Sequence, residues 1–376
     1  MTELAASFVS TRPNLPVSQI SVDGEVLEEV VPLEVTVSQA AGKHDSAELV
    51  VLWPSTNSAA IERRPVTFTF GRGRTSAVFR GYVYSVEKSQ GFQKQVVTTI
   101  TCLGVTWPMR TVSARLFSGA PGAAIAAEVV RPHGLGVVVD PDDGYRFPRA
   151  AQVGETDWEF LHELAHSMGM VLVARDGVVR LVNPIAALSK GTPSRTLTKA
   201  TNLLDDPDNN LLDFTPVATV TTERRFLRPT FGYFGTDRSV RTHVPDADPV
   251  DVVQTLHRVV PDSTTADHMI KTSGRWNDYN ETADARVRGD GGLGPGDTVA
   301  VRTGIPAVVD NYDGMWFVMA SSHKIDSKTF QTSLRLSRDA YRRPSDTKVL
   351  RPYWIEDDRL FPTTSLASGR WVSSWR

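Results

Sequence analysis

The sequence lacks several features that would assign it to particular classes of protein. Its 376 residues include a single cysteine, Cys102, so an internal disulfide framework is excluded and folding in a reducing cytoplasm is expected. No stretch approaches the roughly 20 apolar residues of a membrane helix, so we expect no membrane anchor. The N-terminal residues Met1 to Leu4 do not begin the basic region and long apolar run of a signal peptide, and none is expected.

The sequence also lacks an excess of charge of one sign. It has 41 Lys and Arg residues against 43 Asp and Glu residues, which gives a formal net charge of -2. This balance argues against tight nonspecific binding to nucleic acid. The hydrophobic fraction of 40% is enough to bury real cores, and the length suits two or three domains.

The first hundred residues predict a series of short strands. An Asp-Gly turn at Asp23 and Gly24 separates two short apolar runs, which indicates a hairpin. Residues Leu33 to Val37 alternate between apolar and polar types, as in a half-buried strand. Further runs of strand length follow at Ala47–Leu52, Val66–Phe70, Ala77–Val86 and Val96–Leu103. Strands at this spacing favour a barrel or a sandwich.

The middle of the chain has a different pattern. An Ala-rich helix is predicted over Pro121–Val130, and a loop over Asp140–Arg149. A second helix begins after Thr156, an N-cap with Glu159 as its capping-box partner, and stops near Gly169. Its apolar stripe consists of Trp158, Leu161, Leu164, Ala165 and Met168.

Strand patterns then return. A hairpin is predicted from Val171 to Val182, around Asp176 and Gly177, and after a polar stretch more strands continue to about Leu336. The sequence thus predicts a mainly β chain with an α+β insert, and the order of its segments suggests two similar β-barrel domains that flank a small α+β domain. We place the first β-barrel domain at 1–110, the α+β insert at 111–200, the second β-barrel domain at 201–345 and an extended C-terminal arm at 346–376. The arm is rich in aromatic residues, which leads to the hypothesis that it docks onto a neighbouring protein.

One motif points to an enzyme. His162, Glu163 and His166 match H-E-x-x-H, in which two histidines on one helix face bind Zn²⁺ and the glutamate polarises a water molecule. The longer metalloprotease pattern wants a third histidine at position 172, where this chain has Leu172. The polar residues of the motif also lie opposite the apolar stripe, as on a surface helix. The favoured interpretation is a solvated helix face, and the alternative is a zinc-dependent hydrolase or peptidase that uses these three residues.

Three other patterns are weaker. Aromatic and arginine residues alternate over residues 224–241, which fits stacking on single-stranded nucleic acid but favours a hairpin or a subunit interface. The glycine-rich stretch at residues 289–296 lacks the Lys-Ser/Thr pair and helix of a phosphate loop, so it predicts a tight turn that enters a strand. The spacing of Asp206, Asp208 and Asn210 is that of a calcium loop, but Leu211 replaces the required glycine, and a polar linker is the better interpretation.

The segment from Gln152 to Leu161 carries more than the start of a helix. It reads Gln, then Glu-Thr-Asp-Trp-Glu-Phe-Leu, and is followed by Leu164-Ala165, Gly169 and the Asp-Gly hairpin. This pattern resembles a signature of phage tail hub proteins, a family that includes the late-control D proteins of contractile phages and the N-terminal part of VgrG spike proteins. In that signature the positions of the H-E-x-x-H residues hold variable polar residues.

Other stretches resemble the same family, in the same order along the chain. They lie between about residue 15 and about residue 340. The stretches are Asp45–Leu49, Val78–Val83, Arg115–Phe117, Leu293–Val299, Gly314–Val318 and Leu334–Arg338.

The resemblance implies a structural baseplate or tail hub and not an enzyme, with no catalytic residue, no metal site and no cofactor. It implies a homotrimer whose two barrels per chain alternate in a pseudo-hexameric ring. Such a ring joins the hexameric tail tube, or a distal tail protein ring, to a trimeric tip, spike or fibre. The ring forms part of the channel for genome delivery, through which DNA or a tape-measure protein passes. The implied location is the virion, in a phage tail assembled in the host bacterial cytoplasm.

Three functions therefore make different predictions. A hub predicts a hollow trimer without bound metal. A zinc hydrolase predicts stoichiometric zinc and loss of activity in Glu163→Gln. A soluble carbohydrate- or peptide-binding module predicts a monomer with a ligand cleft.

Overall fold

The computed structural model shows a mainly β protein with an α+β insert, as the sequence predicts. None of the helices in the described part of the chain is long and apolar enough to cross a membrane. The predicted arm at 346–376 lies outside the described residues, and so does the polar stretch around Asp205 to Asn210 except for Asn210 itself. The structure describes residues 17–338 except 28–29, 54–57, 72–74, 91–95, 141–143, 200–209, 219–226, 235–239, 244–251, 261, 278–280 and 304–311.

Residues 17–104, which we call the first half, form an antiparallel sheet. The strands predicted there are confirmed. The turn between β1 and β2 contains Asp23 and Gly24, both with positive φ, as a tight Asp-Gly hairpin requires. Cys102 is buried in this sheet, and burial raises the pKa of its thiol to about 12, so the thiol is inert. The strands are β1 (Val17–Val22), β2 (Glu25–Val26), β3 (Val31–Ala40), β4 (Ser46–Leu52), β5 (Pro65–Phe70), β6 (Ala77–Gln90) and β7 (Val96–Gly104).

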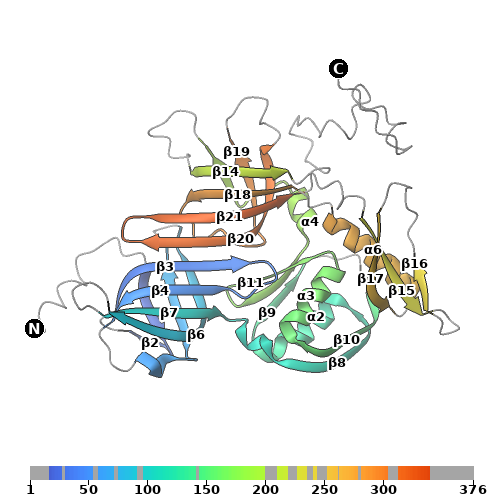
Figure 1. Cartoon of the computed structure of the whole chain (residues 1–376), viewed down its shortest axis with the longest axis horizontal. Coiled ribbons are helices and arrows are strands. Elements are labelled where there is room, and N and C mark those ends of the chain that lie inside the picture. Colours follow the sequence, from blue (N-terminus) through green and yellow to red (C-terminus); the bar gives the residue numbers. More distant parts are fainter. Residues whose placement is uncertain are drawn as a thin grey trace, which may run out of the picture.

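In the middle of the chain two helices lie between two small sheets, and a third, short helix follows them (Figure 1). Both predicted helices form, and Thr156 and Glu159 make the predicted capping box. The prediction of a loop at Asp140–Arg149 is wrong at its end, because Arg146 to Arg149 already belong to a long strand that pairs with β8. The elements are β8 (Val112–Pro121), α2 (Gly122–Val130), β9 (Gly136–Val139), β10 (Arg146–Thr156), α3 (Asp157–Ser167), β11 (Val171–Arg175), β12 (Val178–Val182) and α4 (Pro184–Ser189).

Residues 195–338, which we call the second half, consist mainly of strands. They also contain a helix that the sequence pattern did not reveal. Helix α6 (Ser263–Asn277) follows a separate three-stranded sheet, and its His268 Nε2 lies 3.1 Å from the backbone oxygen of Ser167 at the end of α3. This segment therefore docks back onto the α+β insert. The strands are β13 (Arg195–Thr198), β14 (Leu211–Ala218), β15 (Leu227–Phe234), β16 (Val240–His243), β17 (Val252–Val260), β18 (Glu281–Arg288), β19 (Thr298–Arg302), β20 (Gly314–Asp326) and β21 (Phe330–Arg338).

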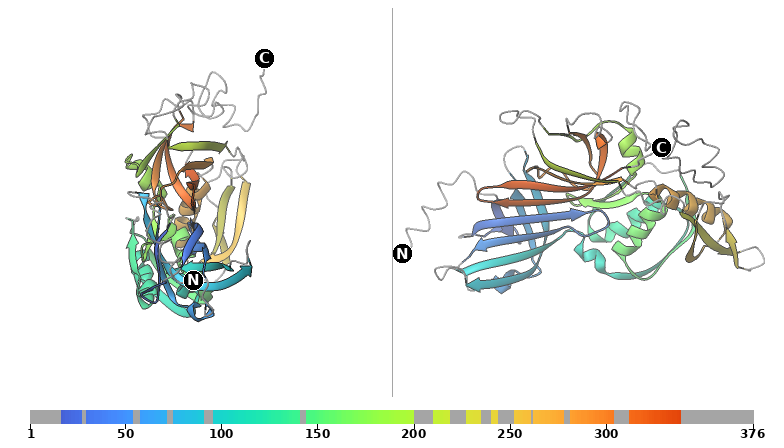
Figure 2. Two further views of the ribbon diagram at one scale, coloured as in Figure 1. Left: turned by 90° about the vertical axis from the view of Figure 1, so that its left-hand side faces the viewer. Right: turned by 45° about the horizontal axis from the view of Figure 1, so that its top comes forward.

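The two halves share one sheet, because β20 pairs with β3 in register from Ala320 and Ala40 to Asp326 and Glu34. The sheet runs in the order β14-β18-β21-β20-β3-β4-β7-β6-β5-β1-β2, and Figure 2 shows its halves side by side. The sequence also predicted closed β-barrels. Among the described residues, no continuous ring of paired strands closes either half into a barrel. In the described part of the chain, Asn210 links β13 to the start of β14 through hydrogen bonds with Thr196 and Thr198.

Candidate functional site

The H-E-x-x-H motif lies on an exposed face of α3. His162, Glu163 and His166 are all exposed, as the predicted polar flank requires. Partial burial and the neighbouring His162 lower the pKa of His166, so the ring stays neutral at pH 7. The described part of the chain brings no group of three or more His, Cys, Asp or Glu side chains together in a way that could hold a metal ion.

The same helix has a packing role against the first half of the chain. Trp158 donates a hydrogen bond from Nε1 to the backbone oxygen of Gly42, at 3.0 Å, and its ring lies 4.9 Å from that of His44. The ring of His162 covers Gly42 so closely that a Cβ atom there would lie 2.6 Å from it. Gly42 also has a positive φ of 72°. Helix α3 thus docks onto the turn between β3 and β4.

A buried polar cluster underlies the signature segment at the start of α3. Asp157 is 1% exposed and receives hydrogen bonds from Arg115 and Gln152, while His133 Nε2 lies 2.7 Å from its Oδ2. Burial disfavours the charged form of Asp157, but the hydrogen bonds from Gln152, His133 and Arg115 outweigh it and hold the pKa below its usual value. Gln152 and Asp157 therefore have a structural role in this cluster at the start of α3.

A second polar cluster joins the insert to both halves. Arg175, at the end of β11, donates from Nη1 to Asp297 Oδ2 at 2.9 Å and from Nη2 to the backbone oxygen of Gly292. The glycine-rich stretch is therefore more than the tight turn that the sequence predicted. Its Gly291 also donates a backbone hydrogen bond to Thr75 in the first half, at 2.8 Å.

A cavity of about 200 Å³ lies beside this junction. Asp45 and Gln39 line it, and Gln39 Nε2 donates to Asp45 Oδ2 at 3.0 Å. Burial raises the pKa of Asp45 to about 7, although the hydrogen bond from Gln39 and the charge of Arg175 act against the rise. The junction thus holds a carboxyl group that titrates near neutral pH.

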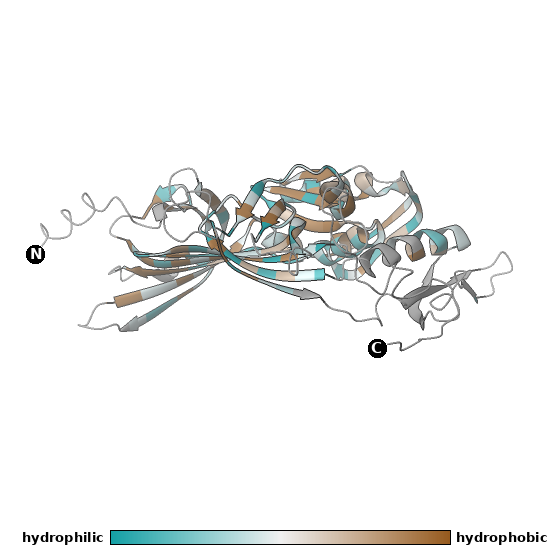
Figure 3. Ribbon diagram, turned by 90° about the horizontal axis from the view of Figure 1, so that it is seen from above, coloured by the Kyte–Doolittle hydropathy of each residue, from teal (hydrophilic) through white to brown (hydrophobic). Residues whose placement is uncertain are grey.

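The outer face of the shared sheet carries polar and charged side chains, among them Glu48, Asp284 and Arg286. Along β4 and β18 buried residues alternate with exposed or partly exposed ones. Figure 3 shows both hydrophobic and hydrophilic residues along the strands. Strand pairing places four serines side by side on four neighbouring strands. From β4 to β21 they are Ser46, Ser38, Ser322 and Ser333. We call these four residues the serine row.

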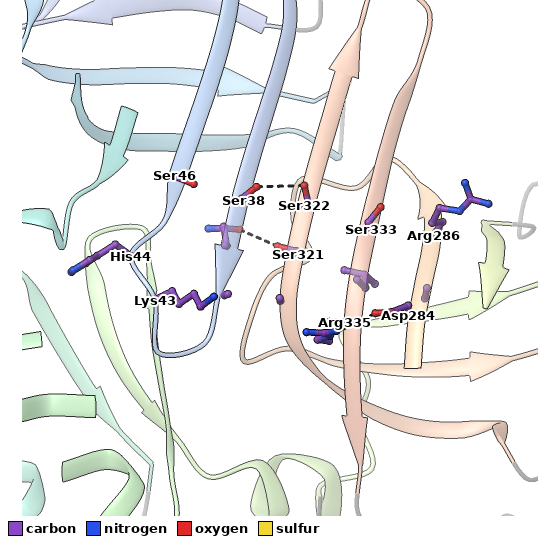
Figure 4. Close-up of a pocket in the computed structure, with 15 residues that line it drawn as sticks. Ser38, Lys43, His44, Ser46, Asp284, Arg286, Ser321, Ser322, Ser333 and Arg335 are labelled. Carbon is purple, nitrogen blue, oxygen red and sulfur yellow. Dashed lines mark hydrogen bonds and ion pairs between the residues drawn. The ribbon is translucent and has the colours of Figure 1, made fainter. Parts of the chain in front are cut away.

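The serine row lies in a groove of about 580 Å³ that crosses the boundary between the two halves. Figure 4 shows the four serines in line, with Arg286 at one end, and a hydrogen bond of 3.5 Å joins the hydroxyls of Ser38 and Ser322. No local sequence pattern indicates this row, since its residues lie in four separate strands. Only the pairing register brings them together.

Charged side chains around the serine row are paired across neighbouring strands. Arg286 Nη2 lies 2.9 Å from Asp213 Oδ2, and Lys324 Nζ lies 2.8 Å from Glu34 Oε1. On the next row, Arg335 Nε lies 3.7 Å from the carboxylate of Asp284. The face therefore carries both signs of charge in close pairs.

Comparison with known proteins places this fold among tail proteins. No family model matches the sequence, and no curated protein matches it. A tail protein from Neisseria meningitidis MC58 is 16% identical over 86% of this chain and 97% of its own, with a TM-score of 0.64. The 43 kDa tail protein of prophage MuSo2 from Shewanella oneidensis is also 16% identical, over 86% of this chain and 98% of its own, with a TM-score of 0.59.

A third similar structure comes from a secretion system. The E. coli c3393 protein, a component of the type VI secretion system, is 10% identical over 89% of this chain and 79% of its own, with a TM-score of 0.57. That protein is described as structurally similar to the T4 bacteriophage tail proteins gp27 and gp5. The chain therefore has the fold of phage tail proteins and of a type VI secretion component, which confirms at the level of fold the resemblance seen in the sequence.

Proposed function

We propose that this protein is a structural component of a phage-type tail, where it serves as the hub of the baseplate. The observation that carries the proposal is the fold shared with two tail proteins over 86% of this chain and nearly all of theirs. Similarity to a type VI secretion component that is itself similar to gp27 and gp5 supports the same role. As in the prediction from sequence, the protein would act in the virion after assembly in the bacterial cytoplasm.

The proposed assembly is a homotrimeric ring. Each chain contributes two β halves that are already joined edge to edge through β3 and β20, so one subunit supplies a stiff stretch of curved wall. Three chains related by a threefold axis close a heterologous interface without fibre growth. Six β halves around one axis match a hexameric tail tube on one side, and the threefold symmetry matches a trimeric tip or spike on the other. A central channel would pass the DNA or a tape-measure protein.

We propose a non-enzymatic role for the H-E-x-x-H residues. His162 covers Gly42 at the docking surface of α3, and the polar side chains of the motif face outward with no third ligand beside them in the described residues. These observations favour packing and solvation over zinc chemistry.

Light scattering after size exclusion, combined with electron microscopy of the purified chain, tests the hub. We expect three times the chain mass and a ring with a central channel. A monomer that carries one zinc ion would contradict the hub and support the hydrolase, and a metal-free monomer with a ligand cleft would support a binding module.

A further inference from the structure

We infer that the two-stranded sheet of β8 and β10, which we call the ribbon, is the docking surface for the C-terminal arm of a neighbouring copy of this chain. Residues 353–357 of that arm cover an exposed apolar block on the ribbon, and Asp357 lies beside Arg149. The inference rests on the proposed function, because an assembly of copies is what brings the arm of one chain to the ribbon of the next. It adds which surface the arm binds and through which residues. Four observations support it.

The first observation is the apolar block itself. Val153, Leu116 and Val112 are 78%, 67% and 60% exposed, more than any other large hydrophobic side chain that the structure describes. Strand register places Val153 opposite Ala114 and Leu116 opposite Ala151, and both alanines are exposed too. We call Ala114, Leu116, Ala151 and Val153 the apolar block. Soluble monomers rarely expose large contiguous apolar patches, so the block indicates an interaction surface.

The second observation is that the backbone of the ribbon can accept another segment. Among the described strands, β8 pairs only with β10, and β10 only with β8. The opposite face of the ribbon already packs on the core of the insert, where the rings of Phe117 and Phe160 lie 5.8 Å apart. The face that carries the apolar block and the strand edges beside it are therefore what the ribbon offers to a partner. Extended peptide segments bind sheets at such edges.

The third observation is a charge next to the apolar block. Val153, Ala151 and Arg149 follow one another along β10 at a spacing of two residues, and all three are exposed. Side chains at this spacing lie on one side of a strand, ~7 Å apart. Ser118, which lies opposite Arg149 on β8, carries no charge that could cancel it. The ribbon thus presents two apolar positions followed by a positive charge.

The sequence of the arm carries the complementary pattern. Tyr353, Ile355 and Asp357 are spaced by two residues and give two apolar side chains followed by a negative charge. Apart from Asp346, every acidic residue of the arm lies in the run 356–358, so only this segment has the pattern. An extended segment antiparallel to β10 places both apolar side chains on the apolar block and Asp357 beside Arg149. Aromatic side chains such as Tyr353 are the residues that protein interfaces favour.

The fourth observation is the position at which the arm begins. Strand β21 ends at Arg338, which is 3% exposed and paired with Glu281 on β18. Figure 1 shows the end of β21 and the ribbon on opposite sides of α2 and α3. Residues 339–352 span at most about 50 Å when fully extended. A heterologous contact joins unlike sides of neighbouring copies, so the arm of one copy meets the ribbon of the next without passing around its own insert.

Cysteine cross-linking in the full chain tests the inference, because the natural Cys102 is buried and its thiol is inert. Ala151→Cys places a thiol in the apolar block, and Ile355→Cys places one in the arm. The double variant would be oxidised mildly and analysed on a denaturing gel without reductant. We expect covalent dimers and trimers to form at least about tenfold faster than in either single variant, because docking raises the effective concentration of the two thiols.

A matched control separates docking from random collision. Val26→Cys combined with Ile355→Cys offers the arm a thiol on β2, at a residue that is 50% exposed and belongs to the first half. We expect its cross-linking to stay at the level of the single variants. Equal cross-linking at Val26→Cys and Ala151→Cys would mean that the arm has no preference for the ribbon, and the inference would fail.

A charge reversal in the double-cysteine chain tests the pairing of the two charged residues. Arg149→Glu should slow cross-linking about fivefold, because Asp357 then meets a like charge at an exposed site. Adding Asp357→Arg should restore the rate, since the two charges are again opposite. If the second reversal does not restore the rate, the contact between these residues is contradicted.

The remaining outcomes also decide the inference. A cross-link that forms only within one chain would show that each arm covers its own ribbon and would overturn it. A trimer that folds but does not cross-link would overturn it and leave the proposed function standing. Light scattering on the same sample identifies a monomer, which would overturn both. If Ala151→Cys does not fold, Leu116→Cys places the thiol in the same apolar block and supplies the test.

Discussion

Arg175 Nη1 donates a hydrogen bond to Asp297 Oδ2 at 2.9 Å and thereby fastens the hairpin of the α+β insert to the glycine-rich loop of the second half. The same guanidinium also reaches the backbone of Gly292. The side chains are 29% and 15% exposed, so the pair is shielded from water on most sides. This contact helps to hold the insert against the shared sheet, together with the hydrogen bond from Trp158 to Gly42.

Removing the contact between Arg175 and Asp297 should lower the stability of the protein. We expect Arg175→Ala to lower the free energy of unfolding by about 1–3 kcal/mol, because the partly buried Asp297 carboxylate loses its charged partner. Urea denaturation measures the change. Arg64→Ala, which breaks the exposed pair with Asp23, is the control and should cost at most about 1 kcal/mol. Equal losses in the two variants would contradict the role given to Arg175.

Asp157 should be among the most sensitive positions. We expect Asp157→Ala to cost roughly 3–5 kcal/mol, because Arg115 would be left without its buried partner. The pKa of Asp157 is lowered, so its contribution is present above its ordinary pKa and is lost as the pH falls below that value. Denaturation at several pH values should therefore show a loss of stability in acid that is smaller in the variant. If the variant loses as much stability in acid as the wild type does, the role given to Asp157 is contradicted.

The contribution of Asp45 to stability should depend on pH in the opposite direction to that of Asp157. The pKa of Asp45 in the folded protein is raised to about 7, so the folded state prefers the protonated acid. The stability it contributes is complete below its ordinary pKa near 4 and is lost as the pH rises through about 7. Asn resembles the protonated acid and cannot ionise. Asp45→Asn should therefore be more stable than the wild type above pH 7 and no different below about pH 4. If the stabilities of the wild type and of Asp45→Asn change with pH in the same way, the raised pKa of Asp45 is contradicted.

The zinc motif gives a simple negative test. Glu163 is exposed, so we expect Glu163→Gln to change stability by less than about 0.5 kcal/mol and to leave the oligomeric state unchanged. Metal analysis of the purified chain should find no stoichiometric zinc. A zinc content of one per chain, lost in His162→Ala, would reverse the interpretation of the motif.

Much of the local structure could be predicted from the sequence. The strands from Ala47 to Leu103 and the capping box of Thr156 and Glu159 depend on residues that are neighbours along the chain, so their patterns are visible without the fold. Helix α6 was missed because it lies among strand-like segments and gains its partner, the end of α3, from far along the chain. The strand that begins at Arg146 was missed because its partner β8 lies across an intervening helix.

The sequence by itself determined that the chain is mainly β, that α3 begins at a capping box, and that the H-E-x-x-H residues lie on a polar helix flank. These properties follow from periodicity and capping, which act over a few residues. Only the tertiary structure decided that β20 pairs with β3, that Arg175 meets Asp297, and that four isolated serines form a row. Those relationships depend on contacts between segments far apart in the sequence, as for Ser38 and Ser322, which are 284 residues apart. A one-residue slip would turn the whole polar face inward, so register is fixed by burial of the opposite face and not by any local signal.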